Sequence, residues 1–557
     1  MYLCALIFIK MKKLFLTLFG AFLILFSTPI SAQNDFEIAK NVDIFVSILK
    51  ELNEKYADEI SPGKLTQTAI DAMLESLDPY TVYYPESEIE DYRLMTTGQY
   101  GGVGALIQQH GKDVVISEPY EGTPSQKAGL RAGDIVKKVN GQSLEGKNSS
   151  DVSAAMKGQP GSTLVLEVFR PSENKTLTFN IVREEIKMPN IPYSGIIGDN
   201  VGYVKLDQFT EKAGSEVREA FLKLKEEGMK YFILDLRENG GGLLNEAVNI
   251  MNIFVDQGVT IVETKGKIPE QQNVHKTRMP VTDKDIPVVV LINDHSASAS
   301  EIVSGAFQDL DRGVIVGKKS FGKGLVQNVL PMDYNTSLKI TVAKYYIPSG
   351  RCVQNIEYFQ KDTTKGAYKI PDSLAVAYKT KNGRTVYDKG GVEPDVVTPD
   401  SLLSDILFAL VTNNLIFDFA NNYRAQHETI APADEFKVDD LLYEEFVTYL
   451  KDKDYSYKST TEEVLEQLKK TAEEDKKFES IEPIYNQLKE RLEQEKSRDL
   501  MTYKNEISQY LASEIVVRYY YQKGRIMNML SYDTDIATAK AVLLDQQRYK
   551  SILSPNK

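Results

Sequence analysis

Between residues 185 and 400, short apolar runs alternate with segments of helical periodicity, and this alternation constrains the fold more than any other feature. Ala213–Glu227 has its apolar side chains on one face of a helix. Strands that alternate with helices favour an α/β core in which helices cover the sheet. The runs that predict strands are Gly202–Leu206, Tyr231–Leu236, Thr260–Thr264, Val288–Ile292 and Val314–Val316.

The rest of the 557-residue chain differs from this core in pattern, so several domains are expected. Residues 35–97 show helical periodicity and predict a small helical arm. Residues 98–184 combine glycine turns with short strands, and residues 185–400 form the α/β core. Residues 401–557 are helical and acidic, with charge runs typical of solvated helix faces, so a scaffold or interaction role is expected there.

The composition excludes several functions. A hydrophobic content of 42% with 26% charged residues is typical of a soluble globular protein. The net charge of −13 argues against a nucleic-acid partner, because neutralising phosphates requires clustered lysine and arginine. The four histidines lack the spacing of a zinc site, so neither a metal nor another cofactor is expected. Cys4 and Cys352 are the only cysteines and do not identify the compartment.

Residues 1–32 have the pattern of a secretory signal peptide. Lys12 and Lys13 precede the apolar run Leu14–Phe26, and a small residue, Ala32, stands at the expected break. Met11 would then be the natural start. Cleavage after Ala32 would export the chain to the periplasm or cell envelope, whereas an uncleaved leader would leave it associated with the membrane.

Asn293–Glu301 is the first candidate for catalytic chemistry. It contains three serines, Ser296, Ser298 and Ser300, directly after the strand-like run Val288–Ile292. A serine at a strand-to-helix corner has a projecting hydroxyl close to helix N-terminal amides, which suits a nucleophile. Taken alone, however, the run fits helix capping better than catalysis.

The second candidate is Phe321–Gln327, in which Lys323 lies between two glycines. Glycines let this backbone approach another segment closely. A lysine acts as general base only when it is neutral, so such a base needs a desolvated site. Serine–lysine pairs are a known variant of the catalytic triad. In an extended stretch, Gln327 would share a face with Lys323 and orient its amine.

Two alternatives explain these segments less well. Gly317–Gly324 almost spells a phosphate-binding loop, but Gly324 stands where a magnesium-binding hydroxyl is required, and a strand-like run follows. A Ser–His–Asp triad would have to use His295, which lies three residues before Ser298 without a nucleophile elbow. The serine–lysine pair therefore remains the first hypothesis.

Residues 98–184 resemble a PDZ domain of the bacterial protease type. A glycine loop, Tyr100–Ile107, leads into a strand, and Gly129–Val136 is a turn into another strand. PDZ domains bind a peptide C-terminus through loop amides and add the peptide as a strand. A glycine cluster alone would indicate only a tight turn. By the resemblance, the carboxylate cradle consists of Gly101, Gly102, Val103 and Gly104.

Together, the motifs from about Asp35 to Asp395 resemble those of the C-terminal processing peptidases, also called tail-specific proteases. These motifs are Leu-Asp-Pro, the PDZ pattern, Asp-Leu-Arg-x-Asn-x-Gly-Gly, Ser-Ala-Ser-Ala-Ser-Glu and Phe-Gly-Lys-Gly-x-Val-Gln. The resemblance implies a multidomain α/β plus PDZ architecture with a crotonase/ClpP-like peptidase core, a helical N-terminal arm and a helical C-terminal extension. That extension departs from the shorter members of the family.

The resemblance also implies the roles of the site residues. Ser298 would be the nucleophile, Lys323 the general base and Gln327 the residue that orients the base. The oxyanion hole would use the backbone amides of Ala299 and of Gly241 or Gly242.

The predicted function is a serine endopeptidase that cleaves envelope or secreted proteins, recognised by apolar C-terminal tails through the PDZ domain. The N-terminal arm is a candidate homodimerisation element. The alternative is a non-catalytic envelope scaffold that binds protein C-termini. The intact Ser298, Lys323 and Gln327 disfavour that alternative.

Overall fold

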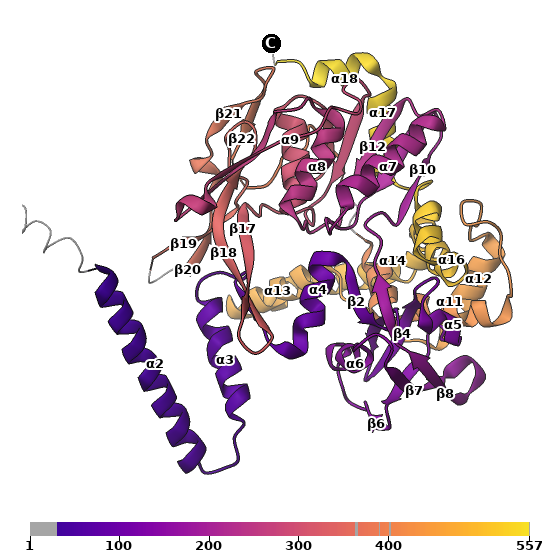
Figure 1. The fold of residues 1–557 in the computed structure, drawn as a ribbon. Helices are drawn as coiled ribbons and strands as arrows, with labels where there is room; N and C mark the ends of the chain where they lie inside the picture. Colours follow the sequence, from indigo (N-terminus) through magenta and orange to yellow (C-terminus); the bar gives the residue numbers. More distant parts are fainter. Residues whose placement is uncertain (1–29, 363–365, 389, 400–402, 556–557) are drawn as a thin grey trace, which may run out of the picture. The chain divides into compact units, whose positions relative to one another are not determined.

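The computed structural model describes residues 30–362, 366–388, 390–399 and 403–555 (Figure 1). Two compact units, residues 1–83 and residues 84–557, make up the chain. Residues 1–29, which hold nearly all of the predicted leader, lie outside the described residues. Within the described ranges, no helix combines the length and the apolar character needed to cross a bilayer.

The first unit contains the helices that the periodicity predicts, α2 (Ile30–Lys55) and α3 (Pro62–Glu75). A short strand, β1 (Val82–Tyr84), lies at the boundary between the units. Large apolar side chains of α2 are exposed, which is unusual for a soluble helix and makes this face available to a partner. They include Phe36, Ile38, Val42, Phe45 and Leu52.

The second unit begins with α4 (Ile89–Thr97) and continues into a small β domain over the predicted PDZ segment. Its antiparallel sheet has the order β3-β4-β5-β7-β8, with β6 beside β5. β2 (Gln99–Gly102) and β9 (Glu184–Lys187) pair separately. The other elements are β3 (Ala105–His110), β4 (Asp113–Pro119), α5 (Pro124–Ala128), β5 (Ile135–Val139), β6 (Gln142–Ser143), α6 (Ser149–Met156), β7 (Thr163–Arg170) and β8 (Lys175–Val182).

The α/β core is a six-stranded sheet in the order β10-β11-β12-β15-β16-β23, in which only β10 is antiparallel to its neighbour. Four of the predicted apolar runs form its central strands. The strands are β10 (Tyr193–Ile196), β11 (Val201–Lys205), β12 (Tyr231–Asp235), β15 (Val288–Ile292), β16 (Val314–Gly317) and β23 (Val396–Val397). The helices are α7 (Ala213–Glu226), α8 (Leu244–Phe254) and α9 (Ala299–Asp309).

The fifth run, Thr260–Thr264, lies outside this sheet, which the alternation alone did not predict. It forms β13 (Thr260–Gly266) of a second, antiparallel sheet. The connection from β13 to its neighbour β14 is too short for the crossover that a parallel strand requires. The sheet also contains β14 (Asn273–Lys276), β17 (Leu325–Met332) and β18 (Thr336–Tyr346), and two hairpins follow: β19 (Ile356–Asp362) with β20 (Gly366–Lys369), and β21 (Ala377–Lys379) with β22 (Thr385–Tyr387).

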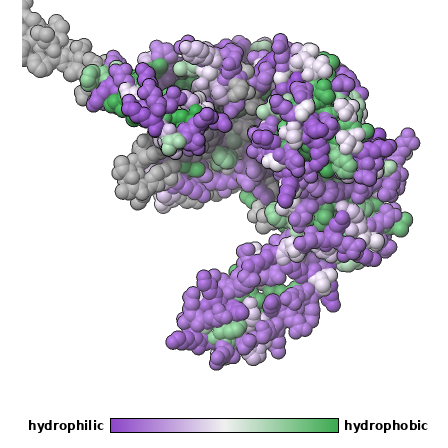
Figure 2. Space-filling model, turned by 90° about the horizontal axis from the view of Figure 1, so that it is seen from below, coloured by the Kyte–Doolittle hydropathy of each residue, from purple (hydrophilic) through white to green (hydrophobic). Residues whose placement is uncertain are grey.

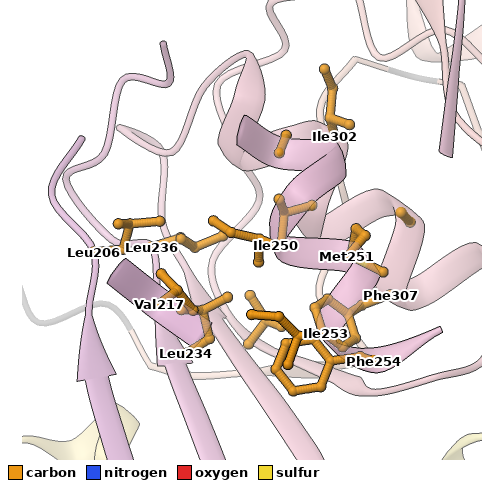
Figure 3. Close-up of a cluster of buried hydrophobic side chains, with 14 of the residues drawn as sticks. Leu206, Val217, Leu234, Leu236, Ile250, Met251, Ile253, Phe254, Ile302 and Phe307 are labelled. Atoms are coloured by element: carbon orange, nitrogen blue, oxygen red, sulfur yellow. The ribbon is translucent and has the colours of Figure 1, made fainter. Parts of the chain in front are cut away.

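The two faces of the six-stranded sheet are covered by different parts of the chain. One face packs against α7, α8 and α9, where the rings of Phe254 and Phe307 meet (Figure 3). The ring of Phe221 also contacts that of Phe254. The other face packs against α17 (Thr534–Leu544) and α18 (Gln546–Ile552), drawn in yellow in Figure 1. Tyr549 of α18 donates its hydroxyl to the carbonyl of Val288 and accepts from its amide. The end of the chain thus completes the core.

The C-terminal helical region, residues 403–555, also has a core of its own, in which Phe419, Phe446 and Leu511 are buried. Figure 2 shows one face of the molecule, which is mostly hydrophilic. Besides α17 and α18, its helices are α10 (Asp405–Thr412), α11 (Leu415–Gln426), α12 (Asp440–Tyr449), α13 (Thr460–Glu474), α14 (Phe478–Lys496), α15 (Asp499–Thr502) and α16 (Lys504–Met529).

This helical region also contacts the predicted PDZ domain. His110 lies 3.0 Å from Asp418 of α11, and Gln126 donates to the hydroxyl of Tyr521 in α16. A cavity of about 1030 Å³ lies between the two. Its lining does not include Ser298 or Lys323, so it is separate from the candidate catalytic segments.

Candidate active site

Ser298 stands at the corner between β15 and α9, as the sequence predicts. Its backbone has φ 56° and ψ −112°, a conformation that side-chain-bearing residues rarely adopt and that costs roughly 1–3 kcal/mol. Ser298 is the N-cap residue of α9: its amide donates to the side chain of Glu301 in a capping box, and its carbonyl accepts from the amides of Glu301 and Ile302. This serine therefore combines a helix cap with a strained backbone.

The hydroxyls of the two neighbouring serines, Ser296 and Ser300, are buried and bonded to backbone groups. Ser296 is fully buried, and its hydroxyl donates to the carbonyl of Leu236 and accepts from the amide of Asn293. Ser300 is also fully buried and donates to the carbonyl of Asn239. Both hydroxyls hold loops together, whereas Ser298 is only half-buried.

Glu301, which received no role from the sequence, connects the two candidate segments. Its side chain is fully buried, and each carboxylate oxygen accepts two hydrogen bonds. Oε2 accepts from the backbone amides of Ser298, at 2.9 Å, and Lys323, at 2.8 Å. Oε1 accepts from the hydroxyl of Ser320, at 2.6 Å, and the amide of Gly322, at 2.8 Å. One carboxylate therefore fixes the backbones of both candidate catalytic residues.

The buried position of Glu301 changes the pKa of its carboxyl group. Burial raises the pKa of this carboxyl above its ordinary value, and its hydrogen bonds from Ser320 and from the amides act in the opposite direction. The neighbouring Tyr345 is also buried, and its hydroxyl donates to the carbonyl of Ser298 at 3.1 Å. Burial, with the nearby Glu301, raises the pKa of Tyr345 well above its ordinary value, so this phenol stays a neutral donor.

The glycines around Lys323 are required by close contacts. The amide of Phe321 donates to the carbonyl of Ser296 at 3.0 Å, which lays this segment along the serine loop. A methyl group at Gly322 would lie 2.6 Å from the side chain of Asn355. At Gly324 it would lie 2.8 Å from the amide nitrogen of Gln354. Only glycine permits this approach.

The glycine loop after β12 lies against Ser298. A methyl group at Gly241 would come within 2.8 Å of Cβ of Ser298 and 2.9 Å of the amide nitrogen of Ala299. The amide of Gly241 donates to Oδ1 of Asn239 at 2.9 Å. Among the described residues, the amides of Gly242 and Ala299 have no such acceptor. The loop thus brings unused backbone donors close to the serine.

Gln327 lies on β17, two residues after Leu325 at the start of the strand. Its side-chain amide donates to the hydroxyl of Thr341 on the paired strand at 3.3 Å. Thr341 and Gln327 are cross-strand partners, so this bond follows from the register. The orientation of Lys323 by Gln327 remains a prediction.

The four predicted cradle residues fall in two places. Gly101 and Gly102 belong to β2, and the amide of Gly101 donates to the carboxylate of Glu90 at 2.9 Å. Val103 and Gly104 form the turn into β3, where the carbonyl of Gly104 accepts from the side chain of Ser125. The carboxylate cradle formed by these four residues remains a prediction.

The sequence analysis assigned no role to two residues that support the site, Glu301 and Asn239. Ser298 and Glu301 form a Ser-x-x-Glu pattern at a helix start, in which a glutamate side chain returns to the backbone amide of the first residue. Asn239 is fully buried before the glycines and donates to the carbonyl of Leu206. Within the described residues, no group of histidine, cysteine or acidic side chains is arranged to hold a metal.

A half-buried serine at a strand-to-helix corner, unused amides beside it and a lysine segment bound to the same buried carboxylate are features of the serine peptidases. The comparisons give the family. Residues 200–364 match peptidase family S41, residues 115–170 match the PDZ domain, and residues 406–543 match a probable PDZ-protease C-terminal helical domain.

The relatives agree with these matches. The carboxy-terminal-processing protease of Bartonella bacilliformis is 36% identical over 343 residues, which cover 60% of this chain and 78% of the relative. A probable CtpA-like serine protease of Staphylococcus aureus is 32% identical over 70% of this chain and 77% of the relative. The chain therefore belongs to the carboxy-terminal-processing proteases of peptidase family S41 and carries a PDZ domain.

A solved structure, the photosystem II D1 C-terminal processing protease, is also similar. It shares 27% identity over 65% of this chain and 93% of that chain, with a TM-score of 0.35.

Replacing Glu301 with glutamine is expected to destabilise the core, because an NH₂ group would then oppose two donors. The expected loss is about 2–4 kcal/mol in the free energy of unfolding. Urea titrations followed by circular dichroism measure it. Glu393→Gln, at an exposed glutamate, is the matched control. A Glu301→Gln transition that coincides with the control would contradict the assigned role.

Proposed function

We propose that this protein is a serine endopeptidase in which Ser298 is the nucleophile and Lys323 the general base. The observation that carries the proposal is the shared acceptor: the amides of both residues donate to Oε2 of Glu301. Two amide nitrogens that donate to the same oxygen atom lie close together, so Glu301 holds the backbones of Ser298 and Lys323 near each other. The strained backbone of Ser298 supports the same assignment.

The proposed reaction is acyl transfer. The hydroxyl oxygen of Ser298 attacks a peptide carbonyl, and its proton passes to the neutral amine of Lys323. The tetrahedral intermediate collapses, and Lys323 returns the proton to the leaving amine. Water then hydrolyses the acyl-enzyme by the same route and regenerates Ser298. Gln327 would orient the lysine amine.

The oxyanion hole is proposed to use the amides of Ala299 and Gly242. Gly241 and Gly242 were equal candidates from the sequence, but the amide of Gly241 is occupied by Asn239. Each such donor lowers the acylation barrier by roughly 3–4 kcal/mol. Gly241 would then serve by allowing the loop to pass close to Ser298.

The PDZ domain is proposed to select substrates by their apolar C-terminal tails. β3 is an edge strand of the PDZ sheet, so an extended peptide can add beside it. Val103 and Gly104, in the turn before β3, would receive the tail carboxylate. A non-catalytic scaffold that binds C-termini remains the alternative function.

Export to the periplasm or cell envelope is proposed from the leader pattern of residues 1–32. The substrates would then be envelope or secreted proteins. Mass spectrometry of the mature N-terminus decides between cleavage after Ala32 and an uncleaved anchor associated with the membrane. The parallel sheet with helices on both faces is compatible with a crotonase/ClpP-like core.

Removing either member of the dyad is expected to abolish cleavage. Ser298→Ala and Lys323→Ala should each lower kcat/KM on a tailed protein substrate by roughly 10⁴-fold or more. Ser215→Ala and Lys223→Ala, on the exposed face of α7, are matched controls. Equal cleavage by wild type and both dyad variants would exclude this dyad. Tight binding of apolar tails without cleavage by wild type would favour the scaffold.

Amidation of the substrate C-terminus is expected to raise KM about 10-fold or more with kcat unchanged, because charge-assisted bonds to the tail are lost. Gly104→Ala should weaken tail-peptide binding similarly, since the added methyl would lie 2.5 Å from Cβ of Thr123. Calorimetry measures this binding. Gly111→Ala is the control, because Gly111 also has positive φ but open space around it. Tail binding that is indifferent to amidation would contradict carboxylate recognition.

A homodimer is proposed through the exposed face of α2. Ile38, Val42, Phe45, Leu49 and Leu52 alternate in spacings of four and three, the pattern of a coiled-coil seam. Phe45→Glu is expected to convert the dimer to a monomer in sedimentation equilibrium, because it places a charge in the seam. Lys40→Ala, outside the seam, is the control. Unchanged mass for Phe45→Glu would remove α2 as the dimer contact.

A further inference from the structure

Arg237 lies at the root of the proposed oxyanion loop. It stands two residues after Asp235, the last residue of β12, and precedes Asn239 by two positions, so its place in space sets where the loop begins. Its side chain is mostly buried, with 17% exposed. A charge in such a place needs partners, because burying an unpaired guanidinium costs several kcal/mol.

The inner partner of Arg237 is Asp235, the last residue of β12. Asp235 is 1% exposed, and its carboxylate accepts from the guanidinium of Arg237 at 3.0 Å and 2.6 Å. It also accepts from the hydroxyl of Tyr203 at 2.7 Å. Burial alone would raise the pKa of Asp235, but Arg237 and Lys205 outweigh it and hold that pKa well below its usual range. This half of the arrangement is internal to the α/β core.

The outer partners come from the C-terminal helical region. Asp533 lies 2.8 Å from Nη2 of Arg237, and Asp535 lies 3.0 Å from Nη1. Both carboxylates are about five-sixths buried, so water screens these ion pairs only weakly. Asp533 is also the N-cap of α17, since its carboxylate accepts from the amides of Asp535 and Ile536. The guanidinium of Arg237 therefore joins the end of β12, through Asp235, to the start of α17, through Asp533 and Asp535.

The loop after Arg237 passes this constraint to the donor amides. Glu238 has positive φ, which turns the chain sharply. Asn239 follows, and its carbonyl accepts from the amide of Ala297 at 3.0 Å and the hydroxyl of Ser300 at 2.8 Å. Its side chain accepts from the amide of Gly241. Gly242 follows Arg237 by five positions, and the hydrogen bonds of Asn239 fix the segment between them.

We propose that Asp533 and Asp535 are positioning residues for catalysis: through Arg237 they hold the oxyanion loop in register with Ser298. The inference rests on the proposed function, in which that loop stabilises the tetrahedral intermediate. Neither aspartate touches the substrate. The C-terminal helical region is then part of the catalytic machinery and more than a scaffold.

The test is the double variant Asp533→Asn/Asp535→Asn. Asparagine is as good an N-cap as aspartate, so α17 keeps its start while both charges are removed. The expected result is a fall in kcat of about 10- to 100-fold, because small misplacements of catalytic groups have effects of this size. KM and the Kd of a tail peptide should be unchanged. Labelling of Ser298 by a fluorophosphonate should slow in parallel, because its tetrahedral adduct uses the same hole.

Asp199→Asn is the matched control. Asp199 pairs with Lys540 at 2.9 Å, so it also joins α17 to the core, but it does so at the turn between β10 and β11. Asparagine tolerates the positive φ found there. This control should keep wild-type kcat. A double variant with wild-type kcat, or with the same loss as Asp199→Asn, would overturn the inference.

Thermal unfolding separates positioning from folding. If the double variant is unfolded at the assay temperature, the single variant Asp535→Asn decides, since it removes one ion pair and leaves the N-cap intact. Failure of the inference and failure of the proposed function are distinguishable. If Ser298→Ala retains wild-type cleavage the proposed function fails, whereas an active wild type with an equally active Asp533→Asn/Asp535→Asn overturns only the positioning role.

Discussion

A mostly parallel sheet must be covered on both faces, and this requirement shapes the whole second unit. The strands β11, β12, β15 and β16 are almost entirely buried, with Val204 and Leu234 on one side and Tyr203 and Ile233 on the other. Helices between the strands cover the first side. The second side is covered by α17 and α18, so the core is complete only when the end of the chain has packed. The corner that contains Ser298, between β15 and α9, stands on this sheet.

Within that frame, one buried carboxylate organises the candidate site. Glu301 lies on α9 but bonds to the amides of three residues outside the helix, Ser298, Gly322 and Lys323. An unpaired carboxylate in this place would cost several kcal/mol, so the loop that contains Lys323 must close for Glu301 to be satisfied. The geometry of the candidate site and the stability of the core therefore depend on the same hydrogen bonds. Such a site is preorganised before any substrate arrives.

The sequence predicted the strands because their signal is local. Val288–Ile292 is an uninterrupted apolar run, and the serine corner follows from its end and the start of α9. The sheet to which a strand belongs depends on contacts distant in sequence. The apolar run of β13 therefore did not reveal that this strand lies in the second, antiparallel sheet. The charge runs of α13 and α14 correctly predicted exposed helix faces. The sequence of α17 does not predict that Ile536 and Val542 pack on strands β11, β12, β15 and β16, which lie more than 200 residues earlier. An apolar helix face indicates burial but does not identify the surface that buries it.

The same limit applies to the site. A pattern of the form Ser-x-x-Glu indicates a capped helix, but the two bonds from Gly322 and Lys323 to Glu301 arise only after the chain has folded back. The ion pairs of Arg237 show more clearly that local patterns do not predict long-range contacts. Its strand neighbour Asp235 is visible in the sequence, yet Asp533 and Asp535 lie almost 300 residues away. Long-range ion pairs of this kind have no local periodicity, so only the folded structure reveals them.

The C-terminal helical region binds the PDZ domain and the α/β core within one turn of one helix. In α16, Tyr521 accepts from Gln126 of the PDZ domain, and the next residue, Gln522, donates to Asp207 of the core at 3.1 Å. Tyr521 has φ 55° and ψ −165°, which breaks the helical geometry and turns adjacent side chains to different neighbours. Such a backbone costs roughly 1–3 kcal/mol and persists only when surrounding contacts fix it. Both domains are therefore attached to the element that leads directly into α17 and the aspartates bound to Arg237.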